Sequence, residues 1–274
     1  MGLKKSQQEL WKHSKAKVEL LRLYLEQYIN ILNQTPFIKK VYIYDLFCGE
    51  GIYPNGGKGS PIIIVESLKQ IRTSQNPATF EVLFNDSDST KILKLKANID
   101  SLKPLPSTIA QLKFKTENYR SFLPEIVSDL ISSEANSRAF IFLDPYRYSD
   151  IQFEDIKNLL ISRKTEVLLF LPTQFMFRFE RKGRPKSLHK FIEELIPENQ
   201  WPNSHTGIDF IENLTNAFMH KLGHKHFVDS FIITRDVNQF FCLFFFTSHP
   251  YGFETMLNAK WLLDEKVRSW MVAS

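Results

Sequence analysis

The feature of this sequence that most restricts its fold is the order of its apolar runs. Five short segments typical of strands, each followed by a longer amphipathic stretch, occupy the first part of the chain; they are residues 41–44, 82–84, 112–115, 140–143 and 167–171. Four of them are apolar throughout, and residues 112–115 alternate apolar residues with lysine. The alternation of short segments with amphipathic stretches predicts a parallel sheet with helices on both faces. The intervening helices are expected at residues 62–71, from Ser87 or Asp88 to Ile99, and at 122–131 and 151–161.

The pattern changes after the fifth predicted strand. Residues 173–205 form an inserted basic segment with one helical patch at 188–196, and a helix is expected at 208–222. Two apolar runs, 227–233 and 240–246, then follow with only a polar turn between them, which predicts a hairpin. A helix at 253–267 closes the chain.

This ending separates two kinds of α/β fold. Ordinary dinucleotide-binding Rossmann proteins do not usually end in a hairpin, whereas class I methyltransferases insert an antiparallel seventh strand beside the sixth. The predicted fold is therefore a seven-stranded class I methyltransferase-like Rossmann sheet with a terminal hairpin, helices on both faces and an inserted basic segment. We expect one domain over residues 1–274, beginning with a helix at 7–34 whose apolar residues form one stripe.

Composition narrows the class of partner. The 274 residues carry a net charge of +5 and a pI near 9.0, which favours a polyanionic partner such as nucleic acid without requiring one. Two cysteines do not make a disulfide framework, and no apolar run is long enough to span a bilayer. We therefore expect a cytoplasmic protein with no membrane partner.

The first candidate site follows the first predicted strand, in the segment Asp45-Leu46-Phe47-Cys48-Gly49-Glu50-Gly51. Ligands bind at the carboxyl ends of such strands, where glycines permit close approach of the backbone. Asp45 is the candidate for holding the ammonium of a methionine moiety, directly or through water, and Gly49 and Gly51 would pass under the cofactor. The alternative is a simple tight turn. Cys48 is interpreted as a packing residue, and the glycines of residues 56–59 lack the Walker spacing.

Polar residues also follow the second and third predicted strands. Asp86 is the candidate for binding both ribose hydroxyls, and Asp88, a candidate helix N-cap, is the second choice. Asn118 is the candidate for the adenine amine, with a plain cap or turn residue as the alternative. Ser60 is expected to cap the helix that follows it, with Pro61 at the first helical position.

The fourth candidate segment is Asp144-Pro145-Tyr146, directly after the fourth predicted strand. Asp144 and nearby carbonyls would accept hydrogen bonds from a target amine, and Tyr146 would stack on the target base. Catalysis of this kind depends mainly on positioning. The alternative is a strand-ending turn with an incidental aromatic residue.

The inserted segment offers a candidate surface for a phosphate backbone, formed by Arg178, Arg181, Lys182 and Arg184. A solvated loop is the alternative. His220, His224 and His226 have loose metal-like spacing, but neither a cysteine nor a carboxylate pair joins them, so a polar helix end is favoured over a zinc site and no metal is expected.

Taken together, these segments resemble the three-Cys-motif partner proteins, a bacterial group with a methyltransferase-like Rossmann fold. The resemblance covers most of the chain and rests on His13, Lys15 and Lys17 leading into Leu20-Leu21 and Tyr24-Leu25, on Asp45-Leu46-Phe47 with Gly49 and Gly51, on Gly59-Ser60-Pro61, on Asp144-Pro145-Tyr146, and on Met256 with Lys260-Trp261. It implies a three-Cys-motif protein as a partner.

Two further likenesses concern single motifs. Asp144-Pro145-Tyr146 is similar to the Asp-Pro-Pro-Tyr motif of adenine-N6 methyltransferases, but lacks the second proline that shapes the turn. The spacing of His13 and Lys17 is similar to that of an N-terminal helix in some ribosomal-RNA adenine methyltransferases, which implies that Lys17 lies near the cofactor carboxylate.

The first functional hypothesis is an S-adenosylmethionine-dependent methyltransferase acting on a nucleic-acid base amine. The second is a non-catalytic or partner-dependent module that keeps the fold. A third is a toxin or defence effector that handles nucleotides in the same pocket.

Overall fold

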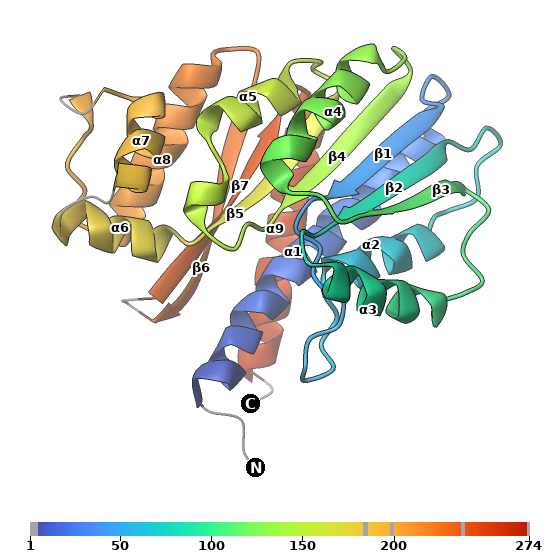
Figure 1. Ribbon diagram of the computed structural model, residues 1–274, viewed down its shortest axis with the longest axis horizontal. Helices are drawn as coiled ribbons and strands as arrows, with labels where there is room; N and C mark the ends of the chain where they lie inside the picture. The colour runs from blue at the N-terminus through green and yellow to red at the C-terminus, as the bar shows by residue number, and fades with distance from the viewer. Residues whose placement is uncertain (1–4, 183–185, 198–199, 237–238, 273–274) are drawn as a thin grey trace. The chain divides into compact units, whose positions relative to one another are not determined.

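Among the described residues, seven strands form one mixed sheet (Figure 1). In this computed structural model, the described backbone covers residues 5–182, 186–197, 200–236 and 239–272, and the described side chains cover 15–147, 149–178, 190–197, 200–233 and 240–265. The strand order is β3-β2-β1-β4-β5-β7-β6. The strands are β1 (Lys40–Asp45), β2 (Thr79–Asn85), β3 (Ile109–Lys115), β4 (Ser137–Leu143), β5 (Thr165–Leu171), β6 (Phe227–Asp236) and β7 (Gln239–Thr247).

The position of β7 decides between the two fold types. β7 pairs antiparallel with β5, from Val167 opposite Phe246 to Leu171 opposite Cys242, and antiparallel with β6 on its other side. The last strand is thus inserted between the fifth and the sixth. The predicted seven-stranded methyltransferase-like sheet with a terminal hairpin is confirmed.

The chain forms two compact units. The first unit comprises Met1–Asn118, Glu134–Ala139 and Glu254–Ser274, and the second comprises Tyr119–Ser133 and Phe140–Phe253. The first unit holds β1, β2 and β3, all parallel, with the helices α1 (Lys5–Gln34), α2 (Ser60–Lys69), α3 (Ser89–Asp100) and most of α9 (Pro250–Val272).

The apolar stripe of α1 forms much of the first unit's core. Leu20, Leu21, Tyr24 and Leu25 are fully buried, and α1 packs against α2. Asn33 ties the end of α1 to a later loop, because its amide donates to the Arg72 carbonyl at 2.8 Å and accepts from the Ala78 amide at 3.0 Å. These contacts hold the helix beside the strands that carry the candidate site.

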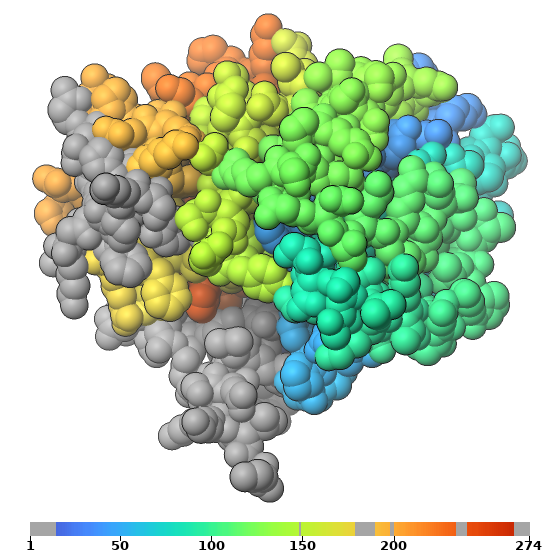
Figure 2. Space-filling view, in the orientation of Figure 1, coloured from blue at the N-terminus to red at the C-terminus, as the bar shows by residue number. Residues whose placement is uncertain are grey.

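The second unit has an aromatic core. It contains β5, β6 and β7, the last part of β4, and the helices α4 (Tyr119–Ser132), α5 (Phe153–Leu160), α6 (Thr173–Lys182), α7 (Lys186–Leu195) and α8 (Gly207–Leu222). Phe218 of α8 lies edge-on to Phe244 and Phe246 of β7, with ring centroids 5.3 and 5.1 Å apart. In Figure 2 the side chains of α4 and α5 form part of the visible surface of this unit.

Two local predictions were wrong. Ser60 is not the N-cap of α2: Gly59 takes that position with an extended backbone, and its amide donates to the Gly51 carbonyl at 2.7 Å. A β-carbon on Gly59 would lie 3.0 Å from the Gly51 oxygen, so the close approach leaves little room for a side chain. The structure also contains α6, in a part of the insertion where no helix was expected.

The helical patch expected at 188–196 corresponds to α7, and Asp88 is the N-cap of α3, as predicted, accepting a hydrogen bond from the Thr90 amide at 2.9 Å. Within the described residues, no helix combines the length and apolar character needed to cross a membrane.

Candidate functional site

The loop after β1 is held in a conformation that requires glycine. Gly49 and Gly51 have φ angles of 63° and 80°, in the left-handed region that side chains disfavour. A β-carbon on Gly51 would lie 2.6 Å from Leu95 Cδ1, whereas one on Gly49 would have no heavy atom within 4 Å. Gly51 therefore lets the loop pack on α3, and Gly49 faces open space.

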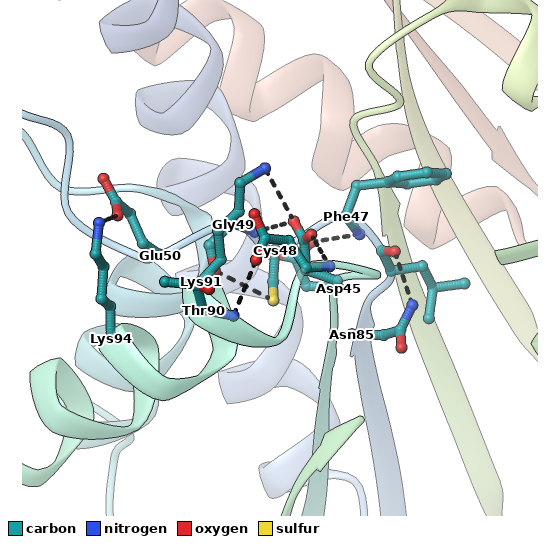
Figure 3. Close-up of polar contacts among 12 residues, drawn as sticks. Asp45, Phe47, Cys48, Gly49, Glu50, Asn85, Thr90, Lys91 and Lys94 are labelled. Carbon is teal, nitrogen blue, oxygen red and sulfur yellow. Dashed lines mark hydrogen bonds and ion pairs between the residues drawn. The ribbon is translucent and has the colours of Figure 1, made fainter. Parts of the chain in front are cut away.

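Asp86, at the end of β2, is bonded to this glycine loop. One carboxylate oxygen accepts from the Gly49 amide at 3.1 Å, and the other accepts from the Asp88 amide at 2.9 Å. Lys91 Nζ lies 3.8 Å from the same carboxylate, whose side chain is 1% exposed. The structure thus brings together two predicted cofactor-binding residues from different strands, and Figure 3 shows Gly49 and Lys91 in this cluster.

Asn85 was not predicted as a site residue, yet it connects three strand ends. Its side-chain amide donates to the Leu46 carbonyl at 3.3 Å and to the Glu117 carbonyl at 3.1 Å, and it accepts from the Glu117 amide at 2.9 Å. Asn85 therefore fixes the loops that follow β1 and β3. The signal in the sequence was a polar residue directly after the apolar run at residues 82–84.

Cys48 is buried beside two carboxylates of the site. Burial raises the pKa of the Cys48 thiol far above its usual range, and the charges of Asp45 and Asp86 raise it further. The thiol stays protonated at neutral pH, which agrees with the interpretation of Cys48 as a packing residue. Two carboxylates beside backbone amides suit a ligand that carries both a cationic group and hydroxyl groups.

Other predicted cofactor residues lie in the same unit. Asp45 is fully buried at the end of β1 and accepts a hydrogen bond from the Phe47 amide at 3.4 Å. Lys17 is buried on α1, and Asn118 is exposed after β3. His13 lies outside the residues whose side chains are described.

Two residues of α3 contact Glu50, which lies between the two glycines of the loop. Lys94 Nζ lies 2.7 Å from a Glu50 carboxylate oxygen (Figure 3). The Asn98 side-chain amide donates to the Glu50 carbonyl at 2.8 Å. Glu50 is thus bound through both its side chain and its backbone, which limits the movement of the residue between the two glycines.

The predicted catalytic segment belongs to the second unit. Asp144 is half-buried directly after β4, Pro145 is buried, and Tyr146 is 58% exposed. The turn is continued by Asp150, which accepts from the Arg147 amide at 3.1 Å. The exposed ring of Tyr146 has the accessibility that stacking on a base requires.

The basic insertion is described only in part. Arg178 is exposed on α6, whereas Arg181 and Lys182 have described backbone but no described side chain, and Arg184 lies outside the described residues. Among the described residues, no group of three or more His, Cys, Asp or Glu is placed to hold a metal ion.

No family model matches this chain, and no curated protein matches it. Among solved structures it is similar to the methyltransferase domain of a bacterial CtHen1, with 14% identity, 83% of this chain and 99% of that chain covered, and a TM-score of 0.40. It is similar to an O-methyltransferase from Bacillus cereus in complex with SAH, with 10% identity, 88% of each chain covered and a TM-score of 0.44. It is also similar to the O-methyltransferase TomG from Streptomyces achromogenes in complex with SAM, with 9% identity, 87% and 88% covered, and a TM-score of 0.42.

Proposed function

We propose that this chain is an S-adenosylmethionine-dependent methyltransferase. The observation that carries the proposal is the joining of the Asp86 carboxylate to the Gly49 amide at 3.1 Å, at the carboxyl ends of neighbouring parallel strands. In open α/β sheets this edge is where nucleotide ligands bind. The antiparallel β7 supports a methyltransferase over a dinucleotide-binding dehydrogenase.

The proposed cofactor contacts follow from the chemistry of each group. Asp45 would hold the ammonium group, Lys17 would lie near the carboxylate, and Asn118 would bind the adenine amine. Asp86 would accept hydrogen bonds from the ribose hydroxyls, because an ionised carboxylate accepts from several donors at once. Since its side chain is 1% exposed, we infer that the Gly49 amide moves away from Asp86 when the ribose binds.

The cofactor supplies an electrophilic methyl group on a sulfonium. The chain needs to orient a nucleophile towards it, and little acid–base chemistry is required. Asp144 and neighbouring carbonyls would accept hydrogen bonds from a target amine, Pro145 would fix the turn, and Tyr146 would stack on the base that carries the amine. Arg178, Arg181, Lys182 and Arg184 would contact phosphates.

The finer assignment is a nucleic-acid base amine of the adenine type as acceptor, in a member of the three-Cys-motif partner family. Support comes from the net charge of +5 and from the exposed Tyr146. The second candidate function is a partner-dependent or non-catalytic module, which the missing second proline after Asp144 favours. A third candidate is a toxin or defence effector that handles nucleotides at the same site. A growth assay with and without the partner gene would distinguish this candidate from the other two.

Cofactor binding is tested by isothermal titration of the full chain with S-adenosylmethionine. Asp86→Ala removes a charged hydrogen-bond acceptor, so its affinity should fall about 10- to 100-fold. Asp88→Ala is the matched control, because Asp88 caps α3 but its side chain is exposed; it should lose stability and keep affinity. The absence of heat with the unaltered chain at millimolar cofactor would refute the proposal, and a loss confined to Asp88→Ala would move the ribose contact to Asp88.

Methyl transfer is tested separately with radiolabelled cofactor and unmodified nucleic acid, with and without the three-Cys-motif protein. Asp144→Ala should abolish transfer while leaving cofactor affinity unchanged, and Asp129→Ala, at an exposed position of α4, is the control. Transfer that survives in Asp144→Ala would remove that residue from catalysis. Cofactor binding without transfer under any of these conditions would favour the non-catalytic module.

A further inference from the structure

A second basic surface lies in the second unit, at the amino-terminal ends of β5 and β6. The eight residues from His220 to Phe227 contain three histidines and two lysines but no acidic residue. His220, Lys221, His224 and Lys225 are exposed, and Phe227, the first residue of β6, is 37% exposed. These side chains form no metal-binding group among the described residues, and they give this end of α8 and the turn after it a concentrated positive charge.

Two aromatic rings stand beside this segment. Phe227 lies opposite Thr247 in the strand pairing, and the chain turns immediately afterwards into His249 and Tyr251, whose rings stack with centroids 5.5 Å apart. Tyr251 is 69% exposed. An exposed, stacked aromatic pair next to a run of lysines and histidines is the combination that single-stranded nucleic acid binds.

The turn that carries this pair is built rigidly. The Thr247 hydroxyl donates to the buried Glu166 carboxylate at 3.0 Å and accepts from the His249 amide at 3.0 Å. A β-carbon on Gly252 would lie 2.0 Å from a Glu166 oxygen, so the turn closes tightly over that carboxylate. These contacts hold the backbone that carries the aromatic pair, which lowers the entropic cost of ordering the turn on binding.

The orientation of His249 is also defined. The Tyr251 amide donates to His249 Nδ1 at 3.3 Å, so in the neutral ring the proton is on Nε2. Nε2 is then a hydrogen-bond donor on an exposed ring, suited to a phosphate or base oxygen. Arg163, which is exposed and lies three residues before Glu166, adds a positive charge at the same strand ends.

This surface is separate from the proposed phosphate contacts of the insertion. Arg178 follows the carboxyl end of β5, whereas His249 and Arg163 lie at its amino end. Seven strand residues span about 20 Å, so one nucleotide cannot touch both.

We propose that the His220–Phe227 segment together with His249 and Tyr251 binds single-stranded nucleic acid, with bases stacking on Tyr251 and phosphates contacting Lys221 and Lys225. The lysines favour a polyanion, and the exposed aromatic pair favours one with flat unpaired bases over an acidic protein. This binding does not depend on the proposed methyltransferase activity.

The test is fluorescence anisotropy of the full chain with labelled oligouridine and oligothymidine of about 12 nucleotides and with a duplex of equal length, without cofactor. Tyr251→Ala should weaken single-strand binding about 5- to 100-fold, and Tyr251→Phe should restore it. Phe37→Ala, at a 58% exposed aromatic position in the first unit, is the matched control and should have no effect.

A second arm measures salt dependence. Replacing Lys221 and Lys225 by Gln should reduce the slope of log affinity against log salt by about 1.4, because each phosphate contact on a single strand contributes about 0.7. The matched control replaces the exposed Lys96 and Lys103 of the first unit by Gln and is measured in the same salt series.

Three results would overturn the proposal: no binding of either oligonucleotide at low salt, equal affinity of Tyr251→Ala and the unaltered chain, or equal affinity for the duplex and the single strands. The RNA and DNA arms show which nucleic acid is preferred. Tyr251→Ala should bind S-adenosylmethionine as the unaltered chain does, so failure here is distinguishable from failure of the proposed function.

Discussion

Replacing Gly51 by Ala tests whether the glycine loop is shaped by packing against α3 as well as by its backbone angle. At Gly51 the new β-carbon meets Leu95 Cδ1 at 2.6 Å and Ile62 Cγ1 at 3.3 Å, in addition to a φ of 80°. A left-handed residue other than glycine costs about 1–2 kcal/mol, and overpacking of a buried site adds about 1–3 kcal/mol. The free energy of unfolding should therefore fall by about 2–5 kcal/mol.

Gly49→Ala is the matched comparison, because Gly49 has a φ of 63° but no atom within 4 Å of the added carbon. Gly49→Ala should lower the free energy of unfolding by only about 1–2 kcal/mol, the cost of a left-handed backbone in a residue other than glycine. Urea unfolding followed by circular dichroism measures both variants. Combining Gly51→Ala with Leu95→Ala should cost less than the sum of the two single changes, because the smaller side chain removes the clash.

The packing explanation would be refuted if the unfolding free energies of Gly51→Ala and Gly49→Ala differed by less than about 0.5 kcal/mol. Differences of that size are within the usual error of additivity between independent sites. Such a result would mean that Leu95 moves aside at no cost and that backbone angle alone selects glycine.

Three other predictions concern buried polar groups. Because burial raises the pKa of the Cys48 thiol, iodoacetamide at pH 8 should leave Cys48 unmodified in the folded chain and modify it in urea, as mass spectrometry would detect; rapid reaction in the folded chain would contradict this. Burial also raises the pKa of Asp155 above its usual value, so its stabilising contribution is present at low pH and is lost as pH rises through the raised value. Asp155→Asn should therefore reduce the decrease in unfolding free energy with rising pH. An unchanged pH dependence in this variant would contradict the assignment to Asp155. Asn33→Ala breaks two long-range hydrogen bonds and should cost about 2–4 kcal/mol in urea unfolding; a cost below about 0.5 kcal/mol would mean that α1 is held by its apolar stripe alone.

The strands and the terminal hairpin were predictable because most strands contain a short apolar run and the last two lack a helix between them. α6 was not predictable from periodicity. Phe175, Phe177 and Phe179 alternate with other residues, which is a strand-like period of two, yet the segment is helical. The helix forms because Met176 is fully buried and Phe177 packs on Phe210 and Phe240, contacts that the local sequence does not contain.

The candidate site was predictable in its residue types and less so in its contacts. Asp45, Gly49, Gly51 and Asp86 follow strands that the pattern located, so their shared edge could be anticipated. The bond from Gly49 to Asp86 and the bridging role of Asn85 depend on how two loops fold against each other, which spacing alone does not specify.

The most direct measurement is a crystal structure of the full chain with S-adenosylhomocysteine bound. Our account predicts the ribose hydroxyls within hydrogen-bond distance of the Asp86 carboxylate, with the Gly49 amide displaced from it and the purine near Asn118. A ligand bound elsewhere, or a ribose held away from an Asp86 that keeps its contact with Gly49, would contradict it.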